Sequence, residues 1–347
     1  MDQSGKRAPL VAIVTPVYNG AAFLAETMAC VQGQTYPNLV HVVLDNASSD
    51  ATPEIIDRYS IRRVPVLARR NAETILQRDN WEVAVRLTPE EATYFLVLCA
   101  DDLIAPDAIE KLVGVAELDP GIGVVGCLWT MGVNPDGAVE HCGEGLPTDQ
   151  SIFDGRCFVK AYLIKLHFAT SPQCQLFRRR LLEDVKLFYP HNEMLMDIDA
   201  CLRSLMHSRY GFVHSPLGFT RVHSERVTAQ VCGPTQEFSA NWLAFIDRYG
   251  HDVMSPPDFE KCRRAYLRHY FRRLLVWRFR DRSKTLFDNH LALLKARGVR
   301  PSAPDYVEAL LEWAWLLIRN RREEVGAATS LWPRTRTELI GTQRLSR

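Results

Sequence analysis

The sequence predicts an α/β protein with a mostly parallel sheet, helices on both faces of that sheet and a helical C-terminal extension. Short apolar runs alternate with helical patterns between residues 9 and 128, as is typical of parallel strands connected by helices. From residue 234 onward the apolar pattern is helical and rich in arginine. The chain has 347 residues, of which 47% are hydrophobic and 24% charged. This is a globular composition and excludes wholesale disorder.

Four short apolar runs are expected to form the first strands, because each is bounded by polar or turn-forming residues. They cover residues 10–14, 40–44, 64–67 and 94–98. Helices are expected after Gly20 and around residues 53–59, where Ser49 and Asp50 precede a proline that suits a first helical turn. A further strand is expected at residues 121–128, and a long loop rich in Gly and Pro at residues 132–147.

Polar residues follow three of these strands at their carboxyl ends. Thr15 and Pro16 close the first strand, Asp45 ends the second, and Asp101 and Asp102 follow the fourth. In open parallel sheets the ligand site lies outside the carboxyl ends of the strands. The sequence therefore predicts a binding site at this edge of the sheet.

The adjacent acids Asp101 and Asp102 are candidates for a metal site. Two neighbouring carboxylates repel each other unless a cation lies between them, and Mg²⁺ or Mn²⁺ held by carboxylates and a substrate diphosphate fits this pattern. The alternative is that one acid caps the helix expected near Pro106 and the other is solvated.

Charge, cysteine content and hydropathy argue against a nucleic-acid-binding, a disulfide-bonded and a membrane-spanning protein. The 42 basic and 41 acidic residues leave a net charge of +1, so nucleic acid is not an expected partner. The nine cysteines are scattered without a Cys-x-x-Cys pair, as expected for small buried residues in a reducing compartment. With no stretch typical of a signal peptide or a membrane span, we expect a cytoplasmic protein.

Three motifs together resemble glycosyltransferase family 2. They are Val-Thr-Pro-Val-Tyr-Asn-Gly at residues 14–20, Gln-Thr-Tyr-Pro at 34–37 and Val-Leu-Asp-Asn-Ala-Ser-Ser-Asp-Ala-Thr at 43–52. The resemblance covers roughly residues 9–230 and implies an inverting nucleotide-sugar transferase with the GT-A fold. It implies a flexible N-terminus (1–8), a catalytic domain (9–233) and a helical, basic C-terminal region (234–347). Within the catalytic domain, residues 9–128 would bind the nucleotide and 129–233 would carry the acceptor side and the base.

The resemblance also implies roles for single residues. The nucleotide would contact Thr15, Pro16, Tyr18, Asn19, Asp45, Asn71 and Asp101, with Asp45 reading a base N–H. Asn71 lies in a weakly patterned stretch, where a solvated loop is an equal alternative. Asp101, Asp102 and His223 would hold Mn²⁺ or Mg²⁺, although Cys99 stands where the family often has Asp. Arg221 would neutralise phosphate or pair with local acids.

Asp197 is the candidate catalytic base. Inverting transfer requires a carboxylate that takes the proton of the acceptor hydroxyl, and Asp197 stays in the family's register although Met196 replaces the usual Glu. The alternative for Asp197 is a helix N-cap. Asp199 is expected to be a charge at the helix start.

The expected donor is a UDP, dTDP or GDP sugar, and the expected acceptor a carbohydrate or lipid-linked glycan. A nucleotidyltransferase is disfavoured because no Gly-rich phosphate loop follows the first strand. A degenerate, non-catalytic binding or scaffold protein is the other alternative, which Met196 and Cys99 support. Residues 261–284 carry ten basic residues and one acid. They are expected to form an amphipathic helix that binds anionic membrane or, as favoured, docks on the catalytic domain and pairs with its acids.

Overall fold

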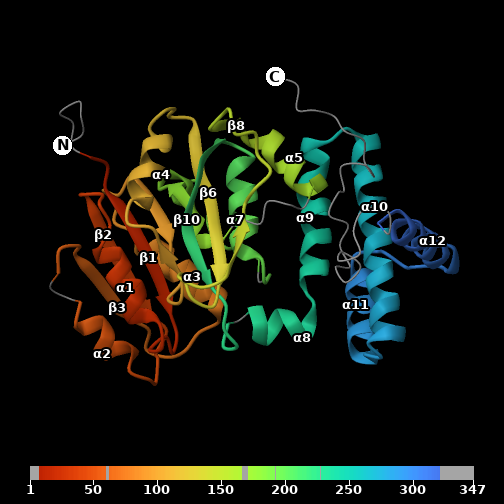
Figure 1. Cartoon of the computed structure of the whole chain (residues 1–347), viewed down its shortest axis with the longest axis horizontal. Coiled ribbons are helices and arrows are strands. Elements are labelled where there is room, and N and C mark those ends of the chain that lie inside the picture. The colour runs from red at the N-terminus through yellow and green to blue at the C-terminus, as the bar shows by residue number, and fades with distance from the viewer. Residues whose placement is uncertain (1–7, 60–61, 166–170, 192, 227, 321–347) are drawn as a thin grey trace. The chain divides into compact units, whose positions relative to one another are not determined.

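The computed structural model describes residues 8–59, 62–165, 171–191, 193–226 and 228–320 (Figure 1). The expected flexible N-terminus lies outside the described residues except for Ala8, and so do residues 321–347 of the expected C-terminal region. The chain divides into two compact units, which are Met1–Val159 with His167–Ser224 and Lys160–Leu166 with Glu225–Arg347.

A mixed sheet forms the centre of the first unit, with strand order β3-β2-β1-β4-β9-β6-β10-β5. The strands are β1 (Val11–Val17), β2 (Leu39–Asp45), β3 (Val66–Arg70), β4 (Tyr94–Val97), β5 (Leu103–Ile104), β6 (Ile122–Gly132), β9 (Gln175–Arg178) and β10 (Arg209–Arg221). Strands β3, β2, β1 and β4 run parallel. Strand β9 is antiparallel to both β4 and β6, and β10 is parallel to β6. The carboxyl ends of β1, β2, β4, β6 and β10 therefore lie at the same edge of the sheet.

The expected strands are present with shifted ends, and regular elements also occur in an expected loop and in a weakly patterned stretch. Part of the expected loop at 132–147 is β7 (Val139–Cys142), which pairs with the long strand β6. The weakly patterned stretch before β4 contains α3 (Gln77–Arg86), which buries Asn80 and Trp81. Both differences have the same cause, because pairing with a neighbouring strand or packing on the sheet stabilises segments whose own pattern is weak.

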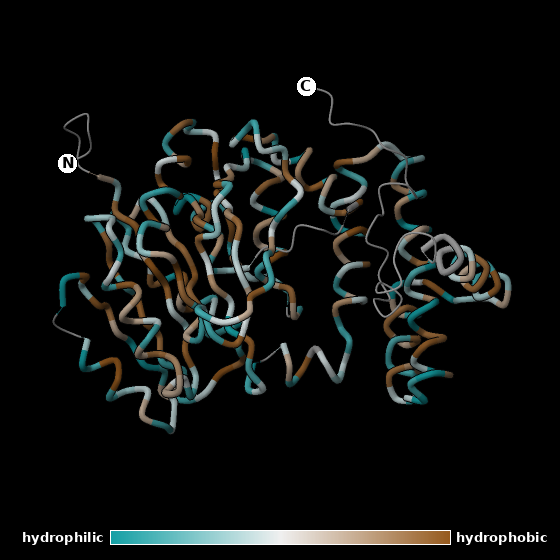
Figure 2. Tube along the Cα trace, in the orientation of Figure 1, coloured by the Kyte–Doolittle hydropathy of each residue, from teal (hydrophilic) through white to brown (hydrophobic). Residues whose placement is uncertain are grey.

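Helices cover both faces of the sheet. On one face, α1 (Leu24–Gln32) and α4 (Ala108–Ala116) pack in a cluster with Ile13 and Leu96, and α1 and α2 (Thr52–Asp57) pack in a second cluster with Val17 and Val43. On the other face Phe95 and Phe177 stack with ring centroids 5.3 Å apart, and Phe188 meets both rings. Helix α7 (Met196–Leu205) lies over that face, where its Arg203 contacts the Phe188 ring. Figure 2 shows hydrophobic residues along the central strands and a mixture on the helices.

Smaller elements complete the first unit. They are β8 (Ile152–Asp154), which pairs with β10, the turn of 3-10 helix at Pro172–Cys174, α6 (Arg180–Glu183) and the first residues of α5 (Gly155–Lys165).

The second unit is helical. Besides the end of α5 it contains α8 (Gly233–Thr235), α9 (Phe238–Val253), α10 (Pro256–Leu275), α11 (Lys284–Ala296) and α12 (Ala303–Asn320). The expected boundary at 233 falls inside this unit. Residues just after it are tied to later helices, since the ring of the buried His290 lies 2.7 Å from the carbonyl oxygen of Thr235.

The basic segment 261–284 is α-helical as far as Leu275, and a π-helical turn (Val276–Arg280) follows. Its arginines pair with acids of their own unit. Arg263 bonds Asp247 of α9 at 2.7 Å, and Arg268 and Arg272 pair with Glu312 of α12. These three arginines of α10 are thus paired with neighbouring acids, whereas Lys261 and Arg264 are exposed. Within the described residues, no helix combines the length and the apolar character that crossing a membrane requires.

Candidate active site

The first two connections of the sheet are bound to each other at the edge where β1 and β2 end. The backbone N–H of Asn19 donates to Ser48 Oγ, and Asn19 Oδ1 accepts from the N–H of Ser49, both at 2.9 Å. Two residues after Asn19, the N–H of Ala21 donates to Asp50 Oδ2 at 2.9 Å. Asn19 has a φ of +48°, a left-handed conformation that asparagine tolerates. The first and third sequence motifs therefore form one structure.

Tyr18 and Pro16 differ in their access to ligands at this edge. Tyr18 is 53% exposed, so its ring face is available to a planar base, whereas Pro16 is buried. Thr15 is fully buried, and its hydroxyl lies 2.9 Å from Nε2 of His41. Burial lowers the pKa of His41 to about 3, so the ring is neutral. Thr15 therefore packs in the core with its hydroxyl bonded to another strand.

Asp45 lies at the end of β2 with only 2% of its surface exposed. One carboxylate oxygen accepts the N–H of Ser48 at 2.9 Å, and the other pairs with Arg70 Nη1. Arg70 also donates to the carbonyl oxygen of Ser48 at 2.8 Å. Arg70 stands in the stretch where the family resemblance implies Arg or Asn groups near the nucleotide, and the β2–β3 register places it directly opposite Asp45.

Asn71 holds the loop that follows β3. Its amide donates to Asn46 Oδ1 at 2.8 Å and to Asn80 Oδ1 at 2.9 Å, and its backbone N–H donates to the carbonyl oxygen of Asp45. Asn71 is therefore tied to the end of β2 and to α3, and its amide hydrogens are used within the protein.

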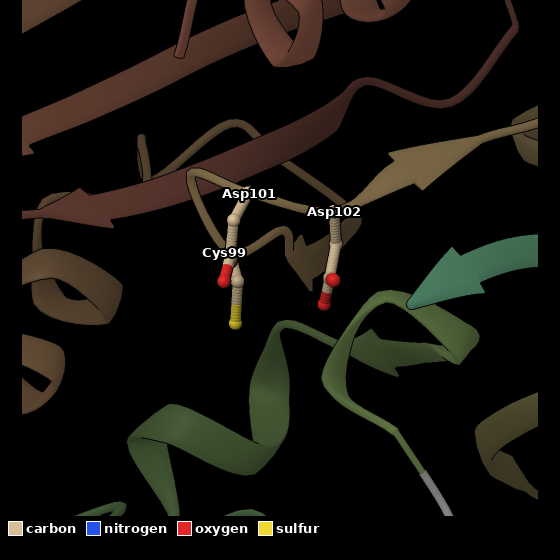
Figure 3. A group of neighbouring side chains, drawn as sticks. All are labelled: Cys99, Asp101 and Asp102. Carbon is tan, nitrogen blue, oxygen red and sulfur yellow. The ribbon is translucent and has the colours of Figure 1, made fainter. Parts of the chain in front are cut away.

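The acidic loop after β4 brings three potential ligands together. Atoms of Cys99, Asp101 and Asp102 that could bind a metal ion all lie within 4.8 Å of one another. Figure 3 shows the three side chains pointing to the same side of the loop. Nε2 of His223 lies 2.9 Å from Asp101 Oδ2. Two carboxylates fit a hard divalent cation, whereas a thiol prefers softer metals. Asp101 and Asp102 are thus the suitable ligands, with His223 beside them.

Arg221 does not point freely into this site. It is 5% exposed, its Nη2 donates to Glu26 of α1 at 2.7 Å, and its Nε donates to the carbonyl oxygen of Asp101 at 3.1 Å. Of the two interpretations from sequence, pairing with a local acid describes the arrangement in the structure.

Asp197 lies in the first turn of α7, whose N-cap is Leu195. Burial of its carboxyl group raises the pKa of Asp197 to about 6, against the opposing effect of hydrogen bonds from the N–H groups of Ile198 and of Asp197 itself. Burial of Tyr189 is the main cause that raises its pKa. The charges of Asp197 and, next, of Cys99 raise this pKa further. Asp197 and the acidic loop are therefore both within electrostatic reach of Tyr189.

Gln175, at the start of β9, is a buried amide that the sequence did not single out. It is 1% exposed, and among the described residues neither polar atom of its side chain has a hydrogen-bond partner. The β6–β9 register places Gln175 opposite Gly126, and its neighbour Leu176 pairs with Leu96 of β4.

Replacing Gln175 with methionine is expected to stabilise the protein. A buried polar group without a partner costs roughly 1–3 kcal/mol, and methionine has a similar length without that penalty. We expect the free energy of unfolding, measured by urea denaturation, to rise by about 1 kcal/mol. The control is Gln173→Met, since Gln173 is equally buried but bonds Thr220 and Ser171. A loss of stability in both variants would show that the Gln175 amide is satisfied in solution.

Known proteins resemble this chain in sequence and in structure. An uncharacterized glycosyltransferase of Rickettsia typhi is 25% identical over 242 residues, which are 70% of this chain and 73% of that protein. A putative teichuronic acid biosynthesis glycosyltransferase of Bacillus subtilis, TuaG, is 26% identical over 106 residues, 30% of this chain and 40% of that protein.

Two solved structures share the fold. S. aureus TarS 1–349 in complex with UDP has a TM-score of 0.58 at 16% identity, covering 86% of this chain and 80% of that one. The mannosyltransferase PcManGT of Pyrobaculum calidifontis in complex with GDP-Man and Mn²⁺ has a TM-score of 0.55 at 19% identity, covering 91% and 83%. The predicted GT-A fold is confirmed. Residues 12–186, half of the chain, match the sequence model of the family described as "Glycosyl transferase family 2", and the chain belongs to this family of glycosyltransferases.

Proposed function

We propose that this glycosyltransferase moves a sugar from a nucleoside diphosphate donor to an acceptor hydroxyl, with inversion at the anomeric carbon and with the help of a divalent cation. The observation that carries the proposal is the acidic loop at the sheet edge, where Asp101 and Asp102 converge next to His223. The resemblance of the fold to proteins solved with UDP and with GDP-Man and Mn²⁺ supports it.

The donor nucleotide would bind along the ends of β1 and β2. The exposed ring of Tyr18 offers a stacking surface for the base. The carboxylate of Asp45 can accept an N–H of the base, because each carboxylate oxygen has more than one lone pair, and Arg70 beside it can donate to a base carbonyl. These two residues together would read the edge of the base, while Asn71 holds the loop beneath them.

Asp101 and Asp102 would hold Mn²⁺ or Mg²⁺, which when bound neutralises charge on the leaving diphosphate. On the acceptor side, Asp197 would take the proton of the attacking hydroxyl. A base with a pKa of about 6 is deprotonated at neutral pH and is still a stronger base than an ordinary carboxylate. The acceptor would be a carbohydrate, free or lipid-linked, and the relative named for teichuronic acid biosynthesis supports this class.

A thermal-shift panel of UDP, dTDP and GDP, each with Mn²⁺ or with EDTA, tests the donor assignment. A ligand at 100 times its dissociation constant stabilises a protein by about 2.7 kcal/mol. We expect one of the three diphosphates to raise the melting temperature by several degrees, and to do so more strongly with Mn²⁺. The matching nucleoside monophosphates serve as controls, because they lack the β-phosphate.

The proposal would be contradicted if none of the three diphosphates raised the melting temperature above that of the protein without ligand. Binding without any release of nucleoside diphosphate from the corresponding sugar donor would instead favour the binding or scaffold protein considered from the sequence.

A further inference from the structure

Arg221, the last residue of β10, is a buried cation whose hydrogen bonds run to two other segments. Its guanidinium donates to Glu26 at 2.7 Å and to the carbonyl oxygen of Asp101 at 3.1 Å, while its backbone N–H donates to Asp102 Oδ1 at 3.0 Å. One residue thus contacts both members of the acidic pair. A buried arginine is stable only when its donors are satisfied, and here the exposed Glu26 and the acidic loop satisfy them.

Helix α1 and its N-cap also contact the acidic loop and Arg221 through residues other than Glu26. The hydroxyl of Thr27 donates to the carbonyl oxygens of Ala100 and Asp102 at 2.9 and 3.1 Å. The ring of Phe23 lies 4.9 Å from the guanidinium carbon of Arg221 and 4.6 Å from the ring of His223. The start of α1 and its N-cap Phe23 therefore contact Arg221, His223 and the backbone of the acidic loop.

We propose that Glu26 and Arg221 form a clamp that positions Asp101 and Asp102 for metal binding, and that Arg221 acts on these acids rather than on the phosphates of the donor. The proposal rests on the metal-dependent function proposed above. Arg221 fixes the backbone at Asp101 and one oxygen of Asp102, and His223 lies 2.9 Å from Oδ2 of Asp101.

Electrostatics gives Glu26 a second effect on metal binding. A guanidinium beside a cation site repels the cation, and the Arg221 charge is desolvated because its side chain is only 6% exposed. The carboxylate of Glu26 neutralises that charge without occupying the site. Removing Glu26 should therefore weaken metal binding both by loosening Arg221 and by leaving its charge uncompensated.

The test compares Glu26→Gln and Arg221→Lys with the unaltered protein in two measurements. Mn²⁺ affinity is measured by EPR titration in the presence of saturating UDP and, in a parallel arm, GDP. Affinity for the same diphosphates is measured in EDTA by calorimetry. Glu54→Gln is the matched control, because Glu54 is also an exposed acid in a first helical turn, that of α2.

We expect both variants to bind Mn²⁺ about tenfold more weakly, the usual effect of losing a group that orients metal ligands, with unchanged diphosphate affinity in EDTA. Lysine keeps the charge of Arg221 but cannot bond Glu26 and Asp101 together, so its failure to rescue separates positioning from charge.

Three outcomes would overturn the clamp. Glu26→Gln could bind Mn²⁺ as Glu54→Gln does, or Arg221→Lys could lose diphosphate affinity in EDTA, which would make Arg221 a phosphate ligand. The third is an unaltered protein that binds no Mn²⁺ in either arm, in which case the metal part of the proposed function fails with it. The first two outcomes leave the proposed function standing.

Discussion

The Asp197→Asn variant is expected to lose about 10²–10⁴-fold in turnover while its donor affinity stays within about threefold, because a positioned base contributes to the transition state and hardly to ground-state binding. Asparagine keeps the shape of the side chain and can still accept the N–H of Ile198. The measurement is release of nucleoside diphosphate from the sugar donor whose diphosphate binds in the thermal-shift panel, together with calorimetric donor affinity.

The same variant is expected to be more stable than the unaltered protein at pH 8. The folded-state pKa of Asp197 is about 6, above the ordinary value of 3.8, so the folded protein binds this proton more tightly than the unfolded chain. The favourable contribution of this proton to the free energy of unfolding is complete below about pH 4 and is lost as the pH rises through about 6. The difference amounts to roughly 1–3 kcal/mol in favour of Asn at pH 8 and should vanish at pH 4.

Asp184→Asn is the control for both measurements, because Asp184 is an exposed acid of the same unit. In the unaltered protein, the pH profile of turnover should show an acidic limb near pH 6. If Asp197→Asn keeps its turnover and Asp199→Asn loses it, the base lies two residues further along α7. Asp199 is 1% exposed, so its variant must be checked for folding first.

The Asp101→Asn and Asp102→Asn variants are expected to lose the Mn²⁺-dependent part of nucleotide binding. A neutral amide is a poor ligand for a hard cation, so Mn²⁺ affinity should fall by more than about tenfold in each. Binding in EDTA should be retained by Asp102→Asn, since asparagine can still accept the N–H of Arg221. Calorimetry with UDP and GDP, with and without Mn²⁺, measures both quantities.

Glu90→Gln serves as the control for the acidic pair, because Glu90 is an exposed acid in the turn before β4. Full metal dependence in both Asp variants would remove the acidic loop from the metal site. Loss in only one of them would identify the direct ligand, a question that the adjacent positions leave open in the sequence.

The local sequence pattern was enough to predict the first strands and to place the candidate site at one edge of the sheet. The runs that became β1, β2 and β4 are short, apolar and closed by polar residues, and this local pattern is enough to predict parallel strands with Asp45 and Asp101 at their ends. The first and third motifs were recognisable for a related reason. Across the two loops, Asn19 accepts the N–H of Ser49 and Asp50 accepts the N–H of Ala21, so the residue types of Asn19 and Asp50 are restricted by these bonds.

Elements with weak local patterns were decided by tertiary contacts. Helix α3 buries Trp81 against Tyr189, with ring centroids 5.8 Å apart, and β7 exists through its pairing with β6. Such segments gain their stability from partners far away in the chain, and periodicity within a window of a dozen residues does not contain that information.

The roles of charged residues also depended on the tertiary structure. Arg221 lies 195 positions from Glu26 in the sequence, and Arg70 lies 25 positions from Asp45. The sequence does not show which residue a charged side chain pairs with. A buried charge needs such a partner, because desolvating it alone costs more free energy than folding can offset. The raised pKa of Asp197 and the unpaired amide of Gln175 are likewise consequences of burial. Residue types and local patterns thus predicted a candidate site at the sheet edge, and only the packing of distant segments decided which of its groups are paired and which are desolvated.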